Sequence, residues 1–261
     1  MLTTKGRKFG HGLIVLAMVC VSGSSCRSEH IADSAVDPTQ KPIANSGKPA
    51  SESAPITWND VNASYEQVLD YVCLYEKEER AISDGEKQTI RLFFRKPLDV
   101  RLEWLNDRGN VDQTAVYRQG FNDGKVLGRQ NGLLGALAGK LRLDPNDPLA
   151  LSDSRHPITE VGLGKIIDRA QQDAANPRIT SHFDGEEPLN GRAAYKFEFT
   201  AKGNEAVGGL PAARKVLIWI DRELKLPVKL ELYDSEKTLL ERHQFKEVRI
   251  NQKLSDKTFT L

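Results

Sequence analysis

Apolar and polar residues alternate strictly in several segments of the chain. The alternation runs through residues 99–104, 195–199 and 228–232. Successive side chains of a strand point to opposite faces, so this period of two predicts strands with one apolar face and one wet face. The run from Val216 to Ile220 is apolar at every position, which predicts a strand that is covered on both faces.

Turn-forming residues separate these segments. Short connections of Asn, Asp and Gly join antiparallel strands, because parallel strands need a long crossover. The turns we expect are Asp107 to Asn110, Asn122 to Gly124, Asp184-Gly185 and Asn190-Gly191.

Two segments have the spacing of helices instead. Thr57 with Asp60 resembles a helix start, and apolar residues follow at steps of three and four from Val61 to Val72. A second helix is predicted within Thr159 to Ala175, before Asn176-Pro177 stops it. Its main apolar positions are Leu163, Ile166 and Ile167. The order of helix, strands, helix, strands predicts an α+β domain built on a large antiparallel sheet.

The first 25 residues have the parts of a secretory signal peptide. Three basic residues precede the apolar run from Leu13 to Val21, and small residues follow it. The run is under half of the roughly 20 residues that a transmembrane helix needs. We therefore expect residues 1–25 to be removed on export.

Cys26 directly follows these small residues, where a bacterial lipoprotein signal places its acylated cysteine. Gly23 stands where such signals carry a branched aliphatic residue, so ordinary cleavage nearby is the alternative. Residues 26–56 are rich in Ser, Ala and Pro, which predicts a disordered tether. The expected location is the periplasm, with a membrane anchor at Cys26 and a folded domain over residues 57–261; a soluble periplasmic protein is the alternative.

Charge and cysteine content exclude two further classes of protein. Lys and Arg number 37 against 36 Asp and Glu, so no general field attracts nucleic acid. Three cysteines cannot form a disulfide-stapled scaffold. Cys73 lies in an apolar stretch and is expected to be a small buried hydrophobe, or a disulfide partner of Cys26 if that residue carries no lipid.

Signatures of catalysis are weak. His156, His182 and His243 lack the spacing of a zinc motif, and no nucleophile elbow is present in the sequence. Gly135 to Lys140 departs from a phosphate loop in its spacing. We therefore expect no metal, no cofactor and no enzymatic activity. Convergence of the three histidines in space is the observation that would favour an enzyme.

Several motifs together resemble the lipoprotein-carrier superfamily, which includes LolA, LolB and the stress regulator RseB. Its closing strands resemble Val216 to Asp221, Leu226-Pro227 and Glu231 to Asp234, followed by Phe245, Asn251 and Phe259. Upstream, the matching motifs are Phe94 to Pro97, Trp104 and Asn122 to Lys125. The segments around Tyr71 to Arg80, Leu143 to Pro145 and Arg155 to Gly162 look like an uncharacterised bacterial family of exported proteins in the same superfamily.

This resemblance implies a strongly curved antiparallel sheet, an incomplete barrel, with helices covering its concave apolar face. In the carriers the residue before the motif proline is an arginine that holds the lid closed, whereas Lys96 stands here, beside Arg95. An ammonium cannot make the bidentate contact of a guanidinium. The residues expected to form the ligand slot and its lid are Arg95, Lys96, Trp104, Leu163, Ile166, Ile167 and Trp219.

The implied function is that of an exported, membrane-anchored binding protein for a hydrophobic ligand. The expected partner is a lipid or a lipoprotein acyl chain, reached from a membrane to which Cys26 is attached. The alternative is an envelope sensor of the RseB kind that binds a protein partner and transfers no lipid.

Overall fold

The structure, a computed structural model, describes residues 55–80, 86–131 and 139–261. The predicted signal peptide, Cys26 and all of the predicted tether before Pro55 lie outside these described residues. No helix within the described ranges is both long and apolar enough to span a bilayer.

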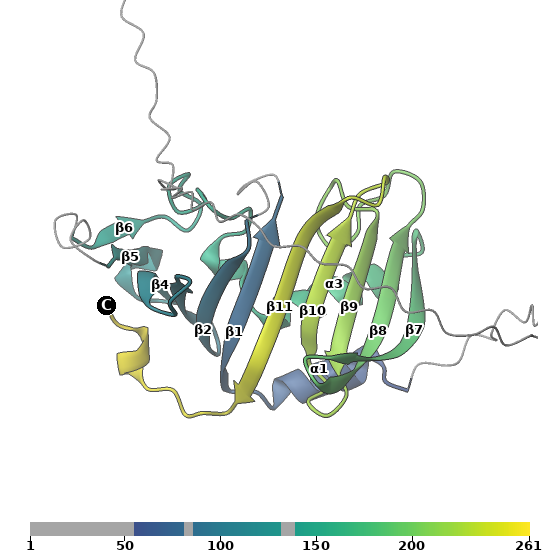
Figure 1. The fold of residues 1–261 in the computed structure, drawn as a ribbon, viewed down its shortest axis with the longest axis horizontal. Helices are drawn as coiled ribbons and strands as arrows, with labels where there is room; N and C mark the ends of the chain where they lie inside the picture. The colour runs from purple at the N-terminus through teal and green to yellow at the C-terminus, as the bar shows by residue number, and fades with distance from the viewer. Residues whose placement is uncertain (1–54, 81–85, 132–138) are drawn as a thin grey trace, which may run out of the picture. The chain divides into compact units, whose positions relative to one another are not determined.

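Eleven strands form one antiparallel sheet (Figure 1). Their order across the sheet is β6-β5-β4-β3-β2-β1-β11-β10-β9-β8-β7, and the two edge strands do not pair with each other. The sheet is therefore open, and Figure 1 shows that it is curved, as the expected incomplete barrel requires. The strands are β1 Asp70–Glu79, β2 Gln88–Arg95, β3 Asp99–Leu105, β4 Val111–Arg118, β5 Val126–Gln130, β6 Leu141–Leu143, β7 Ile179–Leu189, β8 Arg192–Ala201, β9 Lys215–Asp221, β10 Pro227–Tyr233 and β11 Leu239–Ile250.

The sheet consists of two meanders that meet where β1 pairs with β11. The first meander ends at one edge with β6, and the second begins at the other edge with β7. The connection between them, residues 144–178, must therefore cross from one edge to the other. We call it the crossing segment. It contains the 3-10 turn η2 (Ile158–Glu160) and the helix α3 (Leu163–Ala175).

Both predicted helices are present, but the first is shorter than its apolar spacing indicated. Helix α1 (Trp58–Glu66) begins at a capping box in which Thr57 and Asp60 bond reciprocally. It ends before Val72, which lies in β1. The extension was wrong because residues 70–79 pair with strands on both sides, and pairing of a central strand outweighs local helical spacing.

The turn predicted at Asp184-Gly185 was also wrong. These residues lie inside β7, where the register shifts between Phe183 and Glu186. Gly185 has φ of 100°, a conformation that other residues seldom adopt, and the site is a β-bulge rather than a reversal. Turns at Asp107 to Asn110 and Asn190-Gly191 are confirmed, and η1 (Asn122–Gly124) makes the third predicted connection, between β4 and β5. A last 3-10 turn, η3, spans Asp256–Phe259.

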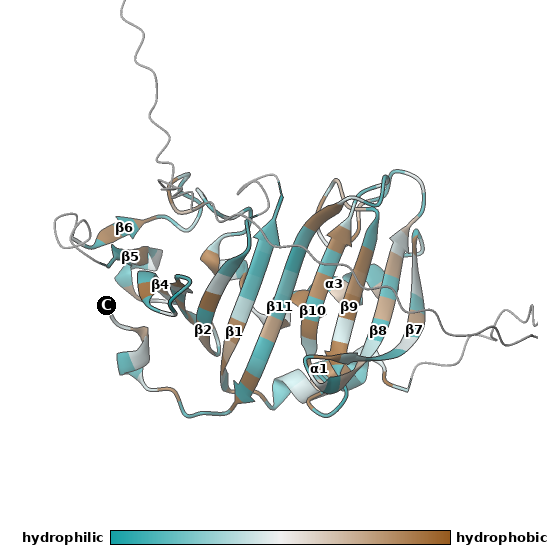
Figure 2. Ribbon diagram, viewed as in Figure 1, coloured by the Kyte–Doolittle hydropathy of each residue, from teal (hydrophilic) through white to brown (hydrophobic). Residues whose placement is uncertain are grey.

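Helices α1 and α3 contact each other and cover one face of the sheet, which we call the covered face. Hydrophobic and hydrophilic residues alternate along β10 (Figure 2), and Leu230 and Leu232 pack in the main core. Val228 does not share their face as the alternation predicted, because the register shifts between Pro227 and Lys229. The opposite face carries a smaller apolar cluster of Ala194, Leu217, Trp219 and Val228. Strand β9 is buried from Val216 to Asp221, so the prediction of a strand covered on both faces is confirmed.

Candidate functional site

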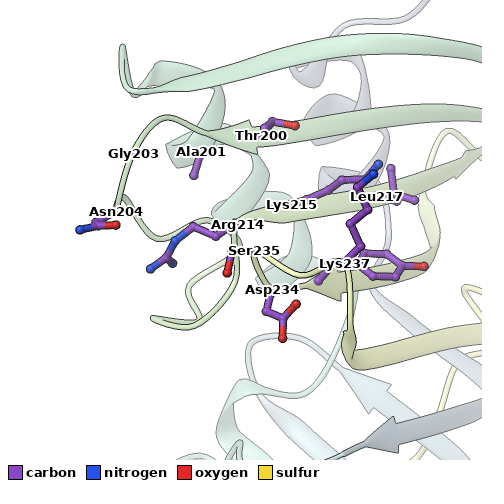
Figure 3. Close-up of a pocket in the computed structure, with 11 residues that line it drawn as sticks. Thr200, Ala201, Gly203, Asn204, Arg214, Lys215, Leu217, Asp234, Ser235 and Lys237 are labelled. Carbon is purple, nitrogen blue, oxygen red and sulfur yellow. The ribbon is translucent and has the colours of Figure 1, made fainter.

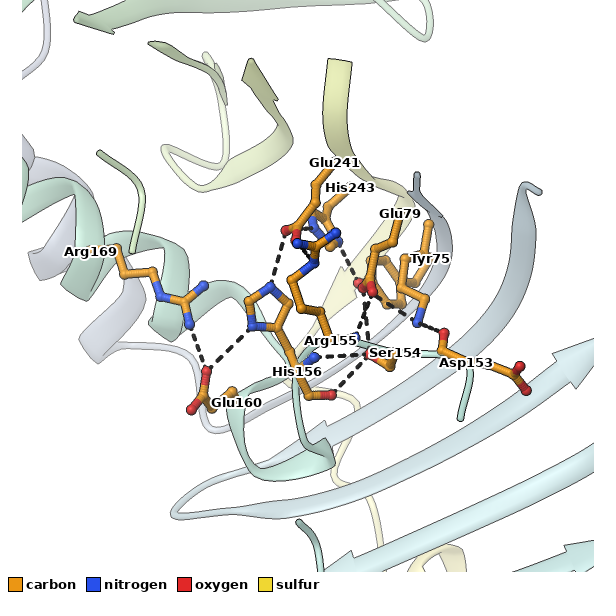
Figure 4. A network of polar contacts seen from close by, with 11 residues as sticks. Tyr75, Glu79, Asp153, Ser154, Arg155, His156, Glu160, Arg169, Glu241 and His243 are labelled. Atoms are coloured by element: carbon orange, nitrogen blue, oxygen red, sulfur yellow. Dashed lines mark hydrogen bonds and ion pairs between the residues drawn. The ribbon is translucent and has the colours of Figure 1, made fainter. Parts of the chain in front are cut away.

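A buried polar cluster lies where the crossing segment passes the two central strands (Figure 4). On β1, Lys77 donates to the carbonyl oxygen of Asp153 at 2.9 Å, and the Glu79 carboxylate accepts from the Arg155 amide at 2.7 Å. On β11, Glu241 faces Arg155, with 2.9 Å between Nε and Oε1. Both strands therefore hold the crossing segment through charged groups rather than apolar ones.

The other oxygen of Glu241 joins two histidines. Its Oε2 lies 3.0 Å from Nε2 of His156 and 3.2 Å from Nε2 of His243. Each imidazole has a partner at its second nitrogen as well. The Tyr75 hydroxyl lies 2.7 Å from Nδ1 of His243, and Oε2 of Glu160 lies 3.6 Å from Nδ1 of His156.

Burial and hydrogen bonds together set the protonation of this cluster. Burial acts to raise the pKa of Glu241, but hydrogen bonds from His156 and His243 outweigh it and hold that pKa far below its ordinary value. Burial also raises the pKa of the Tyr75 hydroxyl well above its usual range. Burial lowers the pKa of Lys77 despite the nearby Glu79. At neutral pH the cluster therefore contains an ionised Glu241 and a protonated Tyr75.

Two of the three histidines named from the sequence converge, and one does not. The rings of His156 and His243 lie with their centroids 6.2 Å apart. His182 is exposed on β7, and its strand is at the far edge of the sheet from this cluster. Glu241 was not identified from the sequence. The signal that was missed is the two-residue spacing of Glu241 and His243, which places both side chains on one face of a strand.

The predicted lid residues lie on α3 against the covered face. Leu163 and Ile167 are fully buried and Ile166 is 7% exposed, and all three pack in the main core. The start of α3 sits close to the sheet, since the Leu163 amide donates to the Tyr71 hydroxyl at 3.1 Å. A Cβ at the preceding Gly162 would lie 2.7 Å from that hydroxyl, so only glycine permits the approach.

Lys96 holds the end of α1. Its ammonium donates to the carbonyl oxygens of Tyr65 at 2.7 Å and Glu66 at 3.4 Å, and it lies 4.2 Å from the centre of the Tyr65 ring. Tyr65 in turn lies against Gly164 of α3, and burial raises the pKa of its hydroxyl to about 12. Lys96 thus contacts α1 directly and reaches α3 only through Tyr65.

The remaining predicted slot residues lie elsewhere. Arg95 binds Asp99 and Asp256 near the C-terminal η3. Trp104 is partly buried at the margin of the main core and donates to Gln88. Trp219 lies on the face opposite the helices, where the Lys229 ammonium is 4.0 Å from its ring centre. The structure therefore brings together the three α3 residues, with Lys96 linked to them through Tyr65, but not Arg95, Trp104 or Trp219.

A surface hollow of about 490 Å³ lies near the ends of β8 and β10 (Figure 3). Arg214, Lys215, Lys237 and Asp234 line it together with small polar residues. It shares none of these residues with the polar cluster or the predicted lid. Cys73, by contrast, is buried in β1, as expected for a small hydrophobe, and it has no disulfide partner among the described residues, which do not include Cys26.

Comparison with protein families gives a match over most of the described chain. The model of the family described as "Protein of unknown function (DUF1571)" matches residues 68–261. No curated protein matches the chain significantly.

Several solved structures are similar in part. The complex of Pseudomonas aeruginosa MucA and MucB matches at 18% identity and a TM-score of 0.48, covering 78% of this chain and 59% of that one. The Mycobacterium tuberculosis lipoprotein LppX matches at 10% identity and 0.43, covering 75% and 93%. A LolA superfamily protein from Nitrosomonas europaea matches at 11% and 0.31, covering 79% and 98%. This chain thus spans about three fifths of the MucB chain.

Proposed function

The chain belongs to the DUF1571 family, and with that membership and the covered face as premises we propose a binding function in the cell envelope. The protein takes a hydrophobic partner, the acyl chain of a lipid or of a lipoprotein, between the covered face and helices α1 and α3. It binds without catalysis. The observation that carries this proposal is the helical cover itself, which lies over a continuous apolar face.

The covered face has the chemistry that an acyl chain requires. The rings of Tyr71 and Phe94 stack 5.0 Å apart near the start of α3. Trp58, the first residue of α1, has its ring centre 5.4 Å from that of Phe197 and 5.6 Å from that of Phe199 on β8. Binding sites for small apolar ligands are lined mainly by such aromatic and aliphatic groups.

The cover is attached by a few polar contacts at its margins. Lys96 bonds to the last carbonyls of α1, and the Tyr71 hydroxyl accepts from the first amide of α3. At the other end of α3, Asp173 accepts from the Gly208 amide at 2.8 Å. The rest of the attachment is apolar packing of α1 and α3 on the main core, which has no direction and can rearrange around a ligand. Opening of α1 and α3 would expose the apolar face to a ligand.

The second part of the proposal concerns location. An acylated Cys26 followed by a tether would hold the domain near a membrane in the periplasm, where acyl chains are available. More than one acyl chain would make the attachment stable, since one chain alone binds membranes weakly. Labelled palmitate should enter the wild-type protein and not Cys26→Ala. Equal labelling of both would remove the anchor from the proposal.

Binding is tested by titrating the full chain with a fluorescent fatty acid. Ile166 on α3 and Val228 on the opposite face are each 7% exposed, so Val228→Ser is a matched control for Ile166→Ser. We expect Ile166→Ser to weaken binding about tenfold, equivalent to ~1.4 kcal/mol, and Val228→Ser to leave the affinity unchanged. Melting curves of both variants separate binding from folding.

Two results would contradict the proposal. Equal loss of affinity in both variants would show that the effect comes from stability alone. Absence of any binding by a folded wild-type protein would favour the alternative, an envelope sensor that recognises a protein partner and no lipid.

A further inference from the structure

We propose that His156, Glu241 and His243 bind a divalent transition-metal ion, with Zn²⁺ as the best fit. The site lies outside the proposed ligand slot and does not depend on it. Imidazole and carboxylate groups are the ligands that zinc takes in proteins alongside thiolates.

Three donor atoms already face one another. One atom from each residue can be chosen so that all three lie within 4.8 Å of one another. Oε2 of Glu241 is 3.0 Å from Nε2 of His156 and 3.2 Å from Nε2 of His243. Ligands at about 2.0 to 2.2 Å from a tetrahedral zinc are roughly 3.3 to 3.6 Å apart. The two distances to Oε2 are close to this spacing, and an ion would enter between the three atoms as the side chains close around it.

The outer contacts suit metal-bound imidazoles. A ligating histidine donates its other ring N–H to a carboxylate or another acceptor, which fixes the ring and raises its basicity. Here the Tyr75 hydroxyl lies 2.7 Å from Nδ1 of His243, and the Glu160 carboxylate lies 3.6 Å from Nδ1 of His156 as an ion-pair partner, so each ring has an oxygen beside Nδ1 when its Nε2 takes the metal. Glu160 is itself held by Arg169 of α3 at 2.6 Å. Both imidazoles are thus oriented with Nε2 toward Glu241.

The positive charge of Arg155 does not occupy the metal-facing oxygen. Arg155 lies against Oε1 of Glu241, whereas both imidazoles meet Oε2. The cluster also balances its other charges, because Glu79 and Glu160 accompany Lys77 and Arg169. The Glu241 side chain is 1% exposed and that of His156 is 18% exposed, so an ion would enter from the side of His156.

A metal at this site would fix the crossing segment to the sheet. His156 belongs to the crossing segment, seven residues before α3 begins at Leu163, while Glu241 and His243 belong to β11. The ion would therefore join the part of the chain that leads into the cover to a central strand. Binding would stabilise the folded state, by an amount that grows with the logarithm of the metal concentration above the Kd, since the unfolded chain holds no such site.

The experiment uses the full chain, expressed without a polyhistidine tag and treated with EDTA. Equilibrium dialysis against Zn²⁺ should give one ion per chain, and Zn²⁺ should raise the melting temperature. Co²⁺ should give visible absorption bands of a low-coordinate site. His182→Ala is the matched control because it removes an exposed histidine far from the cluster, and it should bind as the wild type does.

His156→Ala should weaken Zn²⁺ binding at least about 100-fold and abolish the Co²⁺ bands. Tyr75→Phe keeps the ring that stacks on Phe245 and removes only the outer hydroxyl, so it should weaken binding by roughly 10- to 100-fold. Folded wild-type protein that binds no Zn²⁺ would overturn the proposal. Unchanged binding in folded His156→Ala and folded Tyr75→Phe would also overturn it. Neither result bears on fatty-acid binding.

Discussion

The two ends of the covered face lie on the same strands but are built from different chemistry. At the apolar end, Tyr71 of β1 contacts Phe94 and the start of α3. At the polar end of the same strand, Lys77 and Glu79 bind the crossing segment. Tyr75 lies between them, stacked on Phe245 and bonded to His243. One face of one strand thus changes from apolar burial to directed polar contacts.

This difference determines which substitutions and movements each end tolerates. Apolar contacts have no direction, so shape changes that keep the volume cost little. Buried charges depend on every partner, and removal of one leaves the others unpaired at a large cost. The apolar end is therefore the part able to move and repack around a ligand, and the polar end is the part that stays attached to the sheet.

Two conservative substitutions test this contrast, and one of them should give the largest loss of stability. Glu241→Gln keeps the size of the side chain but removes the charge that faces Arg155 and two imidazoles, so it should cost about 3 kcal/mol. Ile167→Leu keeps the volume at a fully buried position of α3 and should cost less than about 1.5 kcal/mol. Urea unfolding measures both. Equal costs would remove the distinction between the two ends.

The sequence predicted the apolar end far better than the polar end. Alternation within strands and the spacing of Ile166 and Ile167 identify the core, because each follows from local periodicity. The contact of His156 with Glu241 joins residues 85 positions apart and depends on the path of the crossing segment. No local pattern encodes that path. The predicted boundary between α1 and β1 was wrong for another reason. Val68 and Val72 fit the spacing of a helix and also the pattern of a strand.

The pH dependence of stability follows from the same carboxylate. The pKa of Glu241 is lowered from its ordinary value of 4.5 in the folded protein. Its contribution to stability is therefore complete above about pH 4.5 and is lost as the pH falls toward the folded pKa. The stability difference between the wild type and Glu241→Gln should shrink steadily below pH 4.5. A difference that stays constant down to pH 3 would contradict this assignment.

A smaller effect is expected where α1 meets α3. A Cβ at Gly164 would lie 2.6 Å from the Tyr65 hydroxyl, so Gly164→Ala should push the helices apart. Overpacking costs about 1 to 3 kcal/mol, and the better helix propensity of alanine returns roughly 1 kcal/mol. The expected net loss is about 1 kcal/mol.

Gly128→Ala in β5 is the control for this substitution. The nearest atom to its added Cβ would be 3.8 Å away, in ordinary contact, so its melting temperature should not fall. Thermal melts that show the same loss for both glycines would indicate that the helix contact is not tight.

An effect of similar size concerns Lys96, which connects the strand motif to the cover. Its ammonium lies at the C-terminal end of α1, where a cation interacts favourably with the helix dipole, by about 0.3 to 1 kcal/mol. Its position over the Tyr65 ring adds a contribution of about 0.5 to 1 kcal/mol at an exposed site. Lys96→Met keeps the apolar stem and loses both interactions, so it should destabilise the protein by about 1 kcal/mol. Lys96→Arg keeps the charge and should melt close to the wild type.

Because Lys96 holds α1 rather than the core, Lys96→Met should also speed uptake of a fluorescent fatty acid in stopped-flow mixing. If the uptake rate is unchanged while stability falls, α1 is not part of the moving cover, and opening must occur at α3 alone.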